Sequence, residues 1–290
     1  MWGCVRPSRL VPALAALGMT WFSTGASTGA AAYAAPPQRV VSVNLCTDQL
    51  ALSLAAPGQL VSVSRLAHDP ASSAMAETAS AYPVNGSGAE EVFLLNPDLV
   101  LAGTFTAAAT VQTLRDLGLR VELFAPAQRL ADVPRLLAQM GAALGREDAA
   151  AAAIDAFERE LAELSRPPRH RPRAALYYVN GYTSGAQSLA GDILGAAGFD
   201  NVADEAGLAR GGTLPLERLL LLAPDVIVRG RDYPGQARAE EVLAHPALQA
   251  LDGTRIAGTL TDRDWICGTP GVLKAVRAMR DLRLSLEAGE

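Results

Sequence analysis

The chain has 290 residues, half of them hydrophobic, and a formal net charge of −5 at pH 7. That length and composition can build one large core or two medium ones. An acidic chain without a basic cluster is a poor match for a nucleic-acid-binding protein, so we expect no nucleic-acid partner.

The N-terminus predicts an export signal over residues 1–34 and therefore a periplasmic protein. Two arginines precede the apolar run Leu10–Phe22, which has the length of a signal core and is short for a membrane span. Ala32-Tyr33-Ala34 is a small–x–small cleavage site, so we expect cleavage near Ala34. Loss of the two arginines would take the net charge from −5 to −7. An uncleaved anchor is the alternative.

Strand-like and helix-like segments alternate through residues 35–128, which we take as an N-terminal α/β lobe. This order predicts a parallel sheet wrapped by helices. The expected elements are strand Gln38–Asn44, helix Thr47–Ala55, strand Leu60–Ser64, a loop over residues 67–88, a helix from Ala89, strand Leu99–Ala102, helix Ala107–Leu117 and strand Arg120–Phe124.

Residues 129–168 are alanine-rich and predict a helical region. We expect Gly141 and Gly145 to break its first part. No glycine or proline interrupts Glu147–Leu164, where apolar residues recur at helical spacing. This segment therefore predicts a single long helix that connects two lobes.

Residues 169–290 repeat the alternation and predict a C-terminal α/β lobe. The fold class is thus α/β, with two Rossmann-like lobes, mostly parallel sheets and one connecting helix. The expected elements are strand Ala174–Val179, a loop over 180–185, helix Leu189–Ala197, a helix and strand within Pro215–Gly230, helices Gln236–Ala244 and Pro246–Leu251, strand Arg255–Ala257 and helix Val272–Leu286.

A helix–Pro–Asp–strand corner occurs twice, as AEEVFLLNPDLVLAG at Ala89–Gly103 and PLERLLLLAPDVIVRG at Pro215–Gly230. Alignment of the two Pro–Asp pairs places Glu90 on Glu217, 127 residues later. That spacing is too long for a solenoid unit. It favours two similar lobes, and chance recurrence of a common corner is the alternative.

These corners, together with RVVSVNLCTDQLALSLA near the start and DRDWICGTP near the end, resemble the helix-backboned class of periplasmic substrate-binding proteins over residues 38–286. That family feeds cobalamin, ferric siderophores or haem to ABC importers. The resemblance implies a monomer without enzymatic activity or cofactor. It also implies that Glu90 and Glu217 dock into a permease dimer, with Glu91 as a possible substitute for Glu90.

Strand ends and the loops after them direct polar and aromatic side chains toward an interlobe cleft, where ligands bind in open α/β sheets. Aromatic rings suit a large, flat ligand. Trp265 is the strongest candidate because its Asp–Trp setting resembles the cobalamin-binding member of the family. The predicted ligand contacts are Asn44, Cys46, Thr47, Tyr82, Phe105, Tyr182, Arg229, Arg231, Tyr233, Asp264, Trp265 and Cys267.

The same residues leave the cargo open. The Asp–Trp pair favours cobalamin or another corrinoid, whereas Arg229 and Arg231 favour an anionic ferric siderophore or haem. A bare metal ion would need clustered ligands, and the three histidines lie far apart in the sequence. We therefore expect no metal site made by the protein alone.

Cys46 and Cys267 follow predicted strands of opposite lobes, and three interpretations stay open for them. They are inert small residues, a cross-cleft disulfide, or thiol ligands to the metal of a bound chelate. A disulfide requires Cα atoms within about 7 Å. An enzyme with Cys46 or a serine as nucleophile is a more distant alternative, because His170 and His245 fall on no predicted cleft loop.

Overall fold

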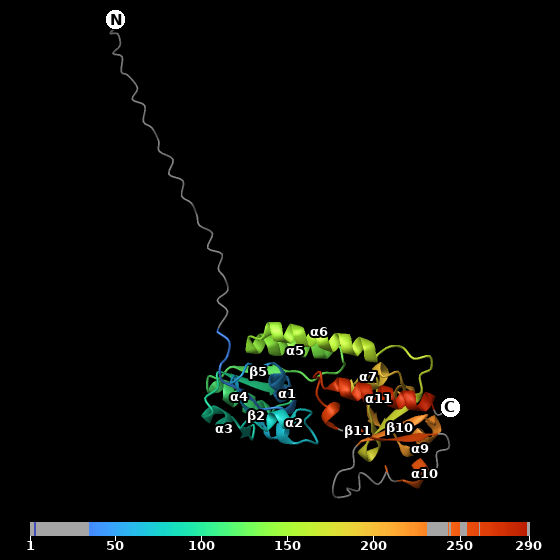
Figure 1. Cartoon of the computed structure of the whole chain (residues 1–290). Helices are drawn as coiled ribbons and strands as arrows, with labels where there is room; N and C mark the ends of the chain where they lie inside the picture. Colours follow the sequence, from blue (N-terminus) through green and yellow to red (C-terminus); the bar gives the residue numbers. More distant parts are fainter. Residues whose placement is uncertain are drawn as a thin grey trace. The chain divides into compact units, whose positions relative to one another are not determined.

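Two parallel sheets, one in each half of the chain, organise the fold (Figure 1). The structure is a computed structural model, and none of its described helices is both long and apolar enough to cross a membrane. The predicted helix Gln236–Ala244, Arg231, Tyr233 and the predicted cleavage site lie outside the described residues. Those residues are 3, 35–230, 243, 245–249, 254–260 and 262–288.

The first sheet has five parallel strands in the order β3-β2-β1-β4-β5. Alternate residues of its central strands face opposite layers, and both layers are apolar, as expected for a parallel sheet. One face packs against helices α1 and α5, and the other packs against α3 and α4. The elements are β1 (Val40–Ser42), α1 (Leu45–Leu54), β2 (Leu60–Ser64), β3 (Val84–Asn85), α3 (Ala89–Leu94), β4 (Leu99–Gly103), α4 (Ala108–Asp116) and β5 (Val121–Phe124).

The second sheet has four parallel strands in the order β11-β10-β6-β8. One face joins the main core through α7 and α11, and the other packs against α8 and α9. A separate antiparallel pair joins β7 to β9. The elements are β6 (Arg173–Tyr177), β7 (Tyr182–Thr183), α7 (Leu189–Ala196), β8 (Asp200–Asn201), α8 (Val202–Glu205), β9 (Gly212–Thr213), α9 (Leu216–Leu222), β10 (Val226–Gly230), β11 (Arg255–Leu260) and α11 (Val272–Glu287).

Helices α5 (Asp132–Leu144) and α6 (Glu147–Leu164) connect the sheets in the chain and pack along each other (Figure 1). Helix α6 is unbroken, as predicted. Gly145 ends α5 with a left-handed φ of 66°. The expected break at Gly141 is wrong, because this glycine lies inside α5, where a Cβ would come within 2.5 Å of the Ala150 methyl group. It is small because two helices meet there.

The loop predicted over 67–88 contains structure, because several of its turns are too short to show a sequence period. These elements are η1 (Arg65–His68), α2 (Ala76–Ala79) and β3; a similar turn, η2 (Val179–Gly181), precedes β7, and α10 (Pro246–Gln249) and η4 (Asp262–Asp264) flank β11. Thr47 does not cap α1. Instead, Asn44 accepts a hydrogen bond from the backbone N–H of Cys46, so the helix begins two residues earlier than expected.

The repeated Pro–Asp corner is also repeated in backbone geometry. Asn96 and Ala223, the residues before the two prolines, both have left-handed φ angles, of 49° and 42°. A residue before proline is disfavoured in the right-handed helical region, so each helix must end there. In both copies the proline is buried and the residue before it is exposed.

The aspartates of the two corners hold the starts of the central strands. Asp98 accepts hydrogen bonds from the backbone N–H groups of Gln38 and Arg39, at 2.6 and 3.0 Å. Asp225 accepts one from the N–H of Arg173, at 2.7 Å. The guanidinium groups of Arg39 and Arg173 donate back to the carbonyl of the residue before the proline. The corner therefore aligns β1 with β4 and β6 with β10 by the same device.

Candidate functional site

Each sheet has one point where its strand order reverses. From β1 the chain adds β2 and β3 on one side and then β4 and β5 on the other; from β6 it adds β8 on one side and then β10 and β11 on the other. At such a point the loops after two neighbouring strands leave in opposite directions and open a crevice at the carboxyl ends, where open α/β sheets bind ligands. The two candidate crevices therefore lie at β1/β4 and β6/β10.

Asn44 and Gly103 meet in the first crevice. Asn44 follows β1, and its amide nitrogen lies 3.1 Å from where a Cβ on Gly103 would stand. The glycine at the end of β4 thus leaves room for the amide. A pocket of about 180 Å³ opens beside them, lined by four of the predicted ligand contacts, Asn44, Cys46, Thr47 and Phe105, together with Ile266 and Gly268 from the second half of the chain.

Tyr178 takes the corresponding place in the second crevice. It follows Arg173 by five residues, as Asn44 follows Arg39. Its ring lies 3.0 Å from where a Cβ on Gly230 would stand, and it stacks on the ring of Tyr182 with centroids 6.4 Å apart. Sequence reasoning chose Tyr182 but missed Tyr178, which alignment of the two arginines that precede the central strands would have found.

Arg229, a predicted contact, ends strand β10 beside Tyr178. Its side chain is half-buried, and its Nη1 donates to the carbonyl of Leu243 at 3.3 Å. The second crevice thus combines two aromatic rings with a guanidinium group, whereas the first is lined by an amide, a hydroxyl and apolar groups.

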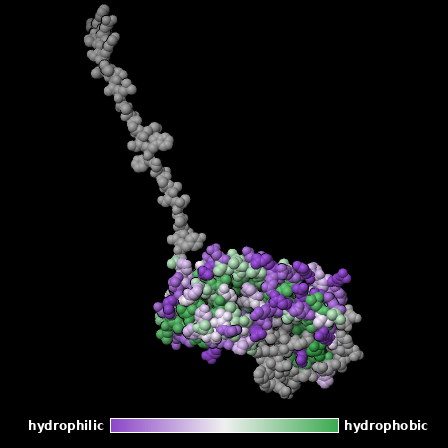
Figure 2. All heavy atoms as spheres, viewed as in Figure 1, coloured by the Kyte–Doolittle hydropathy of each residue, from purple (hydrophilic) through white to green (hydrophobic). Residues whose placement is uncertain are grey.

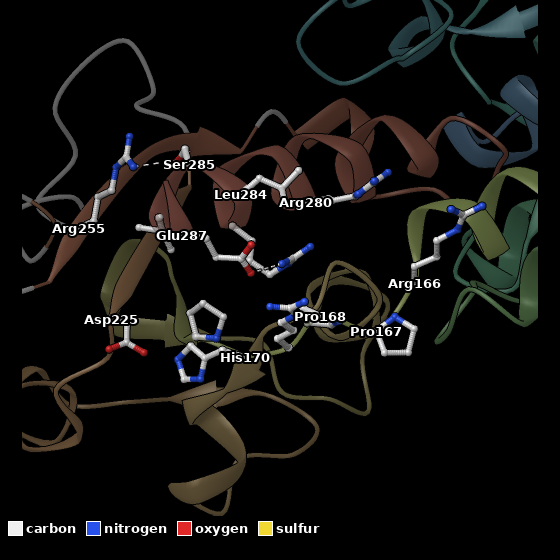
Figure 3. A pocket seen from close by; sticks show the side chains of 14 residues that line it. Arg166, Pro167, Pro168, His170, Asp225, Arg255, Arg280, Leu284, Ser285 and Glu287 are labelled. Atoms are coloured by element: carbon white, nitrogen blue, oxygen red, sulfur yellow. Dashed lines mark hydrogen bonds and ion pairs between the residues drawn. The ribbon is translucent and has the colours of Figure 1, made fainter. Parts of the chain in front are cut away.

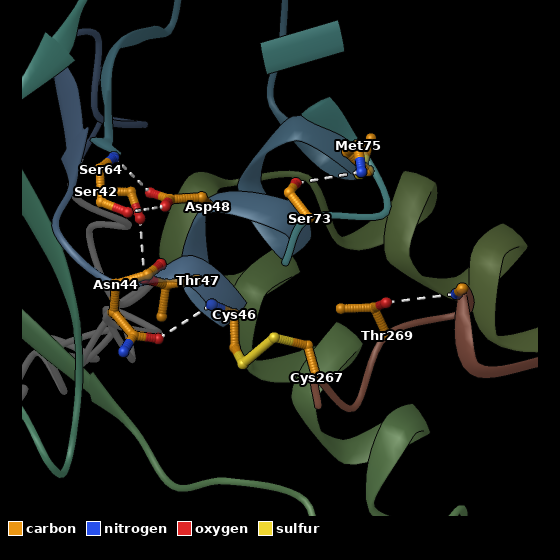
Figure 4. Close-up of a disulfide and its surroundings, with 11 residues drawn as sticks. Ser42, Asn44, Cys46, Thr47, Asp48, Ser64, Ser73, Met75, Cys267 and Thr269 are labelled. Carbon is orange, nitrogen blue, oxygen red and sulfur yellow. Dashed lines mark hydrogen bonds between the residues drawn. A yellow bond between two sulfur atoms is a disulfide. The ribbon is translucent and has the colours of Figure 1, made fainter. Parts of the chain in front are cut away.

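Cys46 and Cys267 form a disulfide between the start of α1 and the loop before α11 (Figure 4). Their Cα atoms are 5.1 Å apart. Of the three interpretations, the structure shows the cross-cleft disulfide, so neither sulfur is a free thiol for a metal or a nucleophile. Beside it, a Cβ on Gly268 would lie 2.2 Å from the methyl group of Ala127, so the two halves are in contact at this edge of the pocket.

Trp265 lies in the hydrophobic core and is only 8% exposed. Its neighbour Asp264 forms an ion pair with Arg263 at 3.7 Å. The indole therefore offers little surface to a ligand in this conformation, and Ile266, which is 50% exposed, is the residue of this segment that lines the pocket. Tyr82 also packs against the core, with its backbone carbonyl 3.1 Å from His68 Nε2.

Asp48, to which the sequence assigned no role, is a buried carboxyl group beneath the first crevice. It accepts hydrogen bonds from the backbone N–H and the hydroxyl of Ser64, at 3.1 and 2.5 Å (Figure 4). Burial raises its pKa to about 6, although hydrogen bonds from Ser42 and Ser64 oppose the rise. The carboxyl group changes charge near neutral pH, next to Thr47 of the pocket wall.

A second pocket, of about 1030 Å³, lies where strands β10 and β11 begin, beside Asp225 and Arg255 (Figure 3). Four exposed or half-buried arginines line it, and two carboxylates are already engaged, Asp225 with Arg173 and Glu287 with Arg283. Its place at the amino ends of the strands separates it from both crevices. The arginines are Arg166, Arg169, Arg255 and Arg280.

Comparison with known proteins now gives the class. Residues 40–255 match the family model described as "Periplasmic binding protein". This match spans most of the chain and both sheets, so the chain belongs to the periplasmic binding protein family.

Individual relatives agree with this assignment. A "Cobalamin-binding protein" from Halobacterium salinarum is 29% identical over 199 residues, which cover 67% of this chain and 54% of that protein. The chain thus spans about half the length of this relative. The periplasmic haem-binding protein RhuT from Roseiflexus sp. RS-1 has a TM-score of 0.67 and 21% identity, over 84% of this chain and 98% of that one.

The periplasmic vitamin B12 binding protein BtuF of Vibrio cholerae has a TM-score of 0.62 and 18% identity, over 85% of this chain and 96% of that one. At this level of identity the solved structures establish a shared fold. The predicted fold class, two α/β lobes with mostly parallel sheets, is confirmed.

Proposed function

We propose that this chain is the periplasmic binding protein of an ABC importer and captures a metal chelate, with cobalamin or another corrinoid favoured. The observation that carries the proposal is the pocket beside Cys46–Cys267, because its walls come from the carboxyl ends of the first sheet and from the second half of the chain. A ligand there touches both halves at once, as a capture protein requires.

A corrinoid is favoured for two reasons. The relative from Halobacterium salinarum is named as a cobalamin-binding protein, and the stacked rings of Tyr178 and Tyr182 offer a flat apolar platform. A pocket of about 180 Å³ holds only part of so large a ligand. We propose that the remainder lies over the two tyrosines, and that Asn44, Thr47 and Phe105 contact the enclosed part.

The test is a set of calorimetric titrations with cyanocobalamin, hemin and a ferric hydroxamate, each followed by its absorption spectrum. We expect cyanocobalamin to bind most tightly, with a 1:1 stoichiometry. Tighter binding of hemin or of the hydroxamate would replace the corrinoid within the same function. Absence of heat and of spectral change with all three would contradict the proposal that the chain captures such chelates.

A haem or an anionic ferric siderophore is the second candidate, and Arg229 favours it. The guanidinium group ends β10 in the second crevice, where it could pair with a carboxylate of the ligand. Arg231 and Tyr233, outside the described residues, belong to the same proposal. Arg229→Gln should weaken hemin binding at least tenfold if a propionate contacts it and should leave cyanocobalamin affinity unchanged.

We propose that Glu90 and Glu217 present the loaded protein to the permease dimer. Both carboxylates are exposed in the first turns of α3 and α9, and neither makes a hydrogen bond or ion pair within the described part of the chain. Glu91, the substitute considered from sequence, already accepts a hydrogen bond from Gly86 N–H at 2.7 Å. This engagement favours Glu90 as the docking group.

Glu90→Ala combined with Glu217→Ala should leave the calorimetric affinity for the chelate intact and stop uptake. Glu91→Ala serves as the matched control and should retain uptake. A large loss of chelate affinity in the double variant would contradict the docking assignment.

The remaining parts of the proposal concern the mature protein. We propose that residues 1–34 are removed near Ala34, that the mature chain is a monomer, and that its lobes comprise residues 35–128 and 169–290 around the helical region 129–168. Mass spectrometry of the exported protein tests the cleavage, and light scattering tests the monomer. A retained N-terminus would favour the anchored alternative.

A further inference from the structure

The two repeated corners expose the same large apolar side chain. Leu94 on α3 is 81% exposed, and Leu221 on α9 is 80% exposed. The alignment of the Pro–Asp pairs, 127 residues apart, places one leucine on the other. Two residues earlier, Val92 and Leu219 are both completely buried, so each helix packs its inner face fully and still shows a leucine to solvent.

A single exposed leucine is common on protein surfaces and needs no explanation. The coincidence here is different, because the two halves share few other exposed residues of this kind at equivalent positions. Burial of a leucine is worth about 1.5–3 kcal/mol, which neither half gains from its own fold. The hydropathy-coloured surface shows hydrophobic residues over α3 and beside α9 (Figure 2). On α3 the patch includes Phe93, which is 45% exposed.

Each leucine also follows the proposed docking glutamate by four residues. Residues four apart lie on the same side of a helix, so Glu90 and Leu94 share one side of α3, and Glu217 and Leu221 share one side of α9. Each half therefore presents a carboxylate beside an apolar side chain. A partner with two-fold symmetry offers the same surface twice, and matched residues on two otherwise different lobes are what such a partner would select.

We propose that Leu94 and Leu221 are apolar contacts of the docking surface, and that each enters an apolar depression beside the cationic group that pairs with Glu90 or Glu217. This inference rests on the proposed docking to a two-fold permease. The carboxylates then set the orientation and the rate of encounter, whereas the buried leucines set the lifetime of the complex.

The experiment measures binding of the purified chain to its permease in lipid nanodiscs. Leu94→Ser combined with Leu221→Ser should raise the dissociation constant at least tenfold, mainly through faster dissociation, and this defect should be insensitive to salt. Leu94→Met with Leu221→Met keeps an apolar side chain and should bind within twofold of the parent. Leu117→Ser, at a leucine that is 43% exposed after α4, is the control for general surface polarity.

The outcomes separate the two proposals. If the glutamate double variant loses binding and the serine double variant does not, the leucines are overturned and the docking glutamates stand. If the glutamate double variant binds as well as the parent, the docking proposal itself fails. If light scattering shows that the parent self-associates and the serine double variant does not, the leucines serve a dimer of this chain and the present inference is wrong.

Discussion

The two halves of the chain use the same corner but place different side chains above it. In both, an arginine precedes the central strand, an aspartate holds that strand, and a glycine ends the next strand. Five residues after the arginine, the first half has Asn44 and the second has Tyr178. The parts that align strands have stayed alike, and the residues that face the crevice differ. This contrast separates framework residues from the residues that choose a ligand.

The covalent tie between the halves should give the largest effect. The Cys46–Cys267 bond closes a loop with a sequence separation of 221 residues. In the chain-entropy description such a bond stabilises the fold by about 5 kcal/mol. Cys46→Ala with Cys267→Ala should lower the free energy of unfolding by up to that amount in urea titrations. Equal stability of the parent with and without reductant would show that the bond does not constrain the unfolded chain.

The next effect concerns Asp48, a buried carboxyl group on α1 of the first half. Its folded pKa of about 6 lies above the ordinary 3.8. The folded state therefore binds the proton more tightly, and this contribution is full below pH 3.8 and lost as the pH rises through 6. The shift corresponds to about 3 kcal/mol. Urea unfolding from pH 4 to 8 should show the parent losing that stability relative to Asp48→Asn, and parallel curves would contradict the assignment.

The two corner aspartates should differ by a smaller amount. Asp98 accepts two backbone hydrogen bonds and Asp225 accepts one. Because both carboxylates are partly solvated, we expect Asp98→Ala to cost about 2 kcal/mol and Asp225→Ala about 1 kcal/mol. Differential scanning calorimetry of the two variants, with Asp98→Asn as a control that keeps an acceptor, measures the difference. A larger cost at Asp225 would break the equivalence of the corners.

The crevice residues should affect ligand affinity more than stability. Tyr178→Ala removes one ring of the stacked pair and should weaken cyanocobalamin binding about tenfold, equal to about 1.4 kcal/mol. Tyr178→Phe keeps the ring and should bind within twofold. Asn44→Ala also removes the cap of α1, worth about 1 kcal/mol, so its affinity is compared at a temperature where both variants are folded. Unchanged affinity in Tyr178→Ala would remove the second crevice from the site.

Sequence patterns predicted the long elements well because helix periodicity and helix breakers are local signals. Helices α4, α6 and α11 end within two residues of their predicted limits. The short turns between Ser64 and Ala89 were missed, since one helical turn is held by its tertiary contacts rather than by its own sequence.

The site was less predictable for a different physical reason. A loop position does not reveal whether an aromatic ring faces solvent or the core, and Trp265 turned inward while Ile266 turned to the pocket. The pairing of Cys46 with Cys267 depends on a Cα separation that only the folded chain defines. Tyr178 was within reach, because the repeat that aligned the corners also aligns the residues after the central strands.

The bond between Cys46 and Cys267 has a consequence for traffic through an importer. It fixes the two halves to each other at the edge of the pocket, so an empty molecule keeps Glu90 and Glu217 at nearly the same separation as a filled one. Empty copies would then compete with filled copies for the same membrane partner. The rate of import would follow the ratio of filled to empty protein, and overproduction of the chain at scarce ligand would slow import.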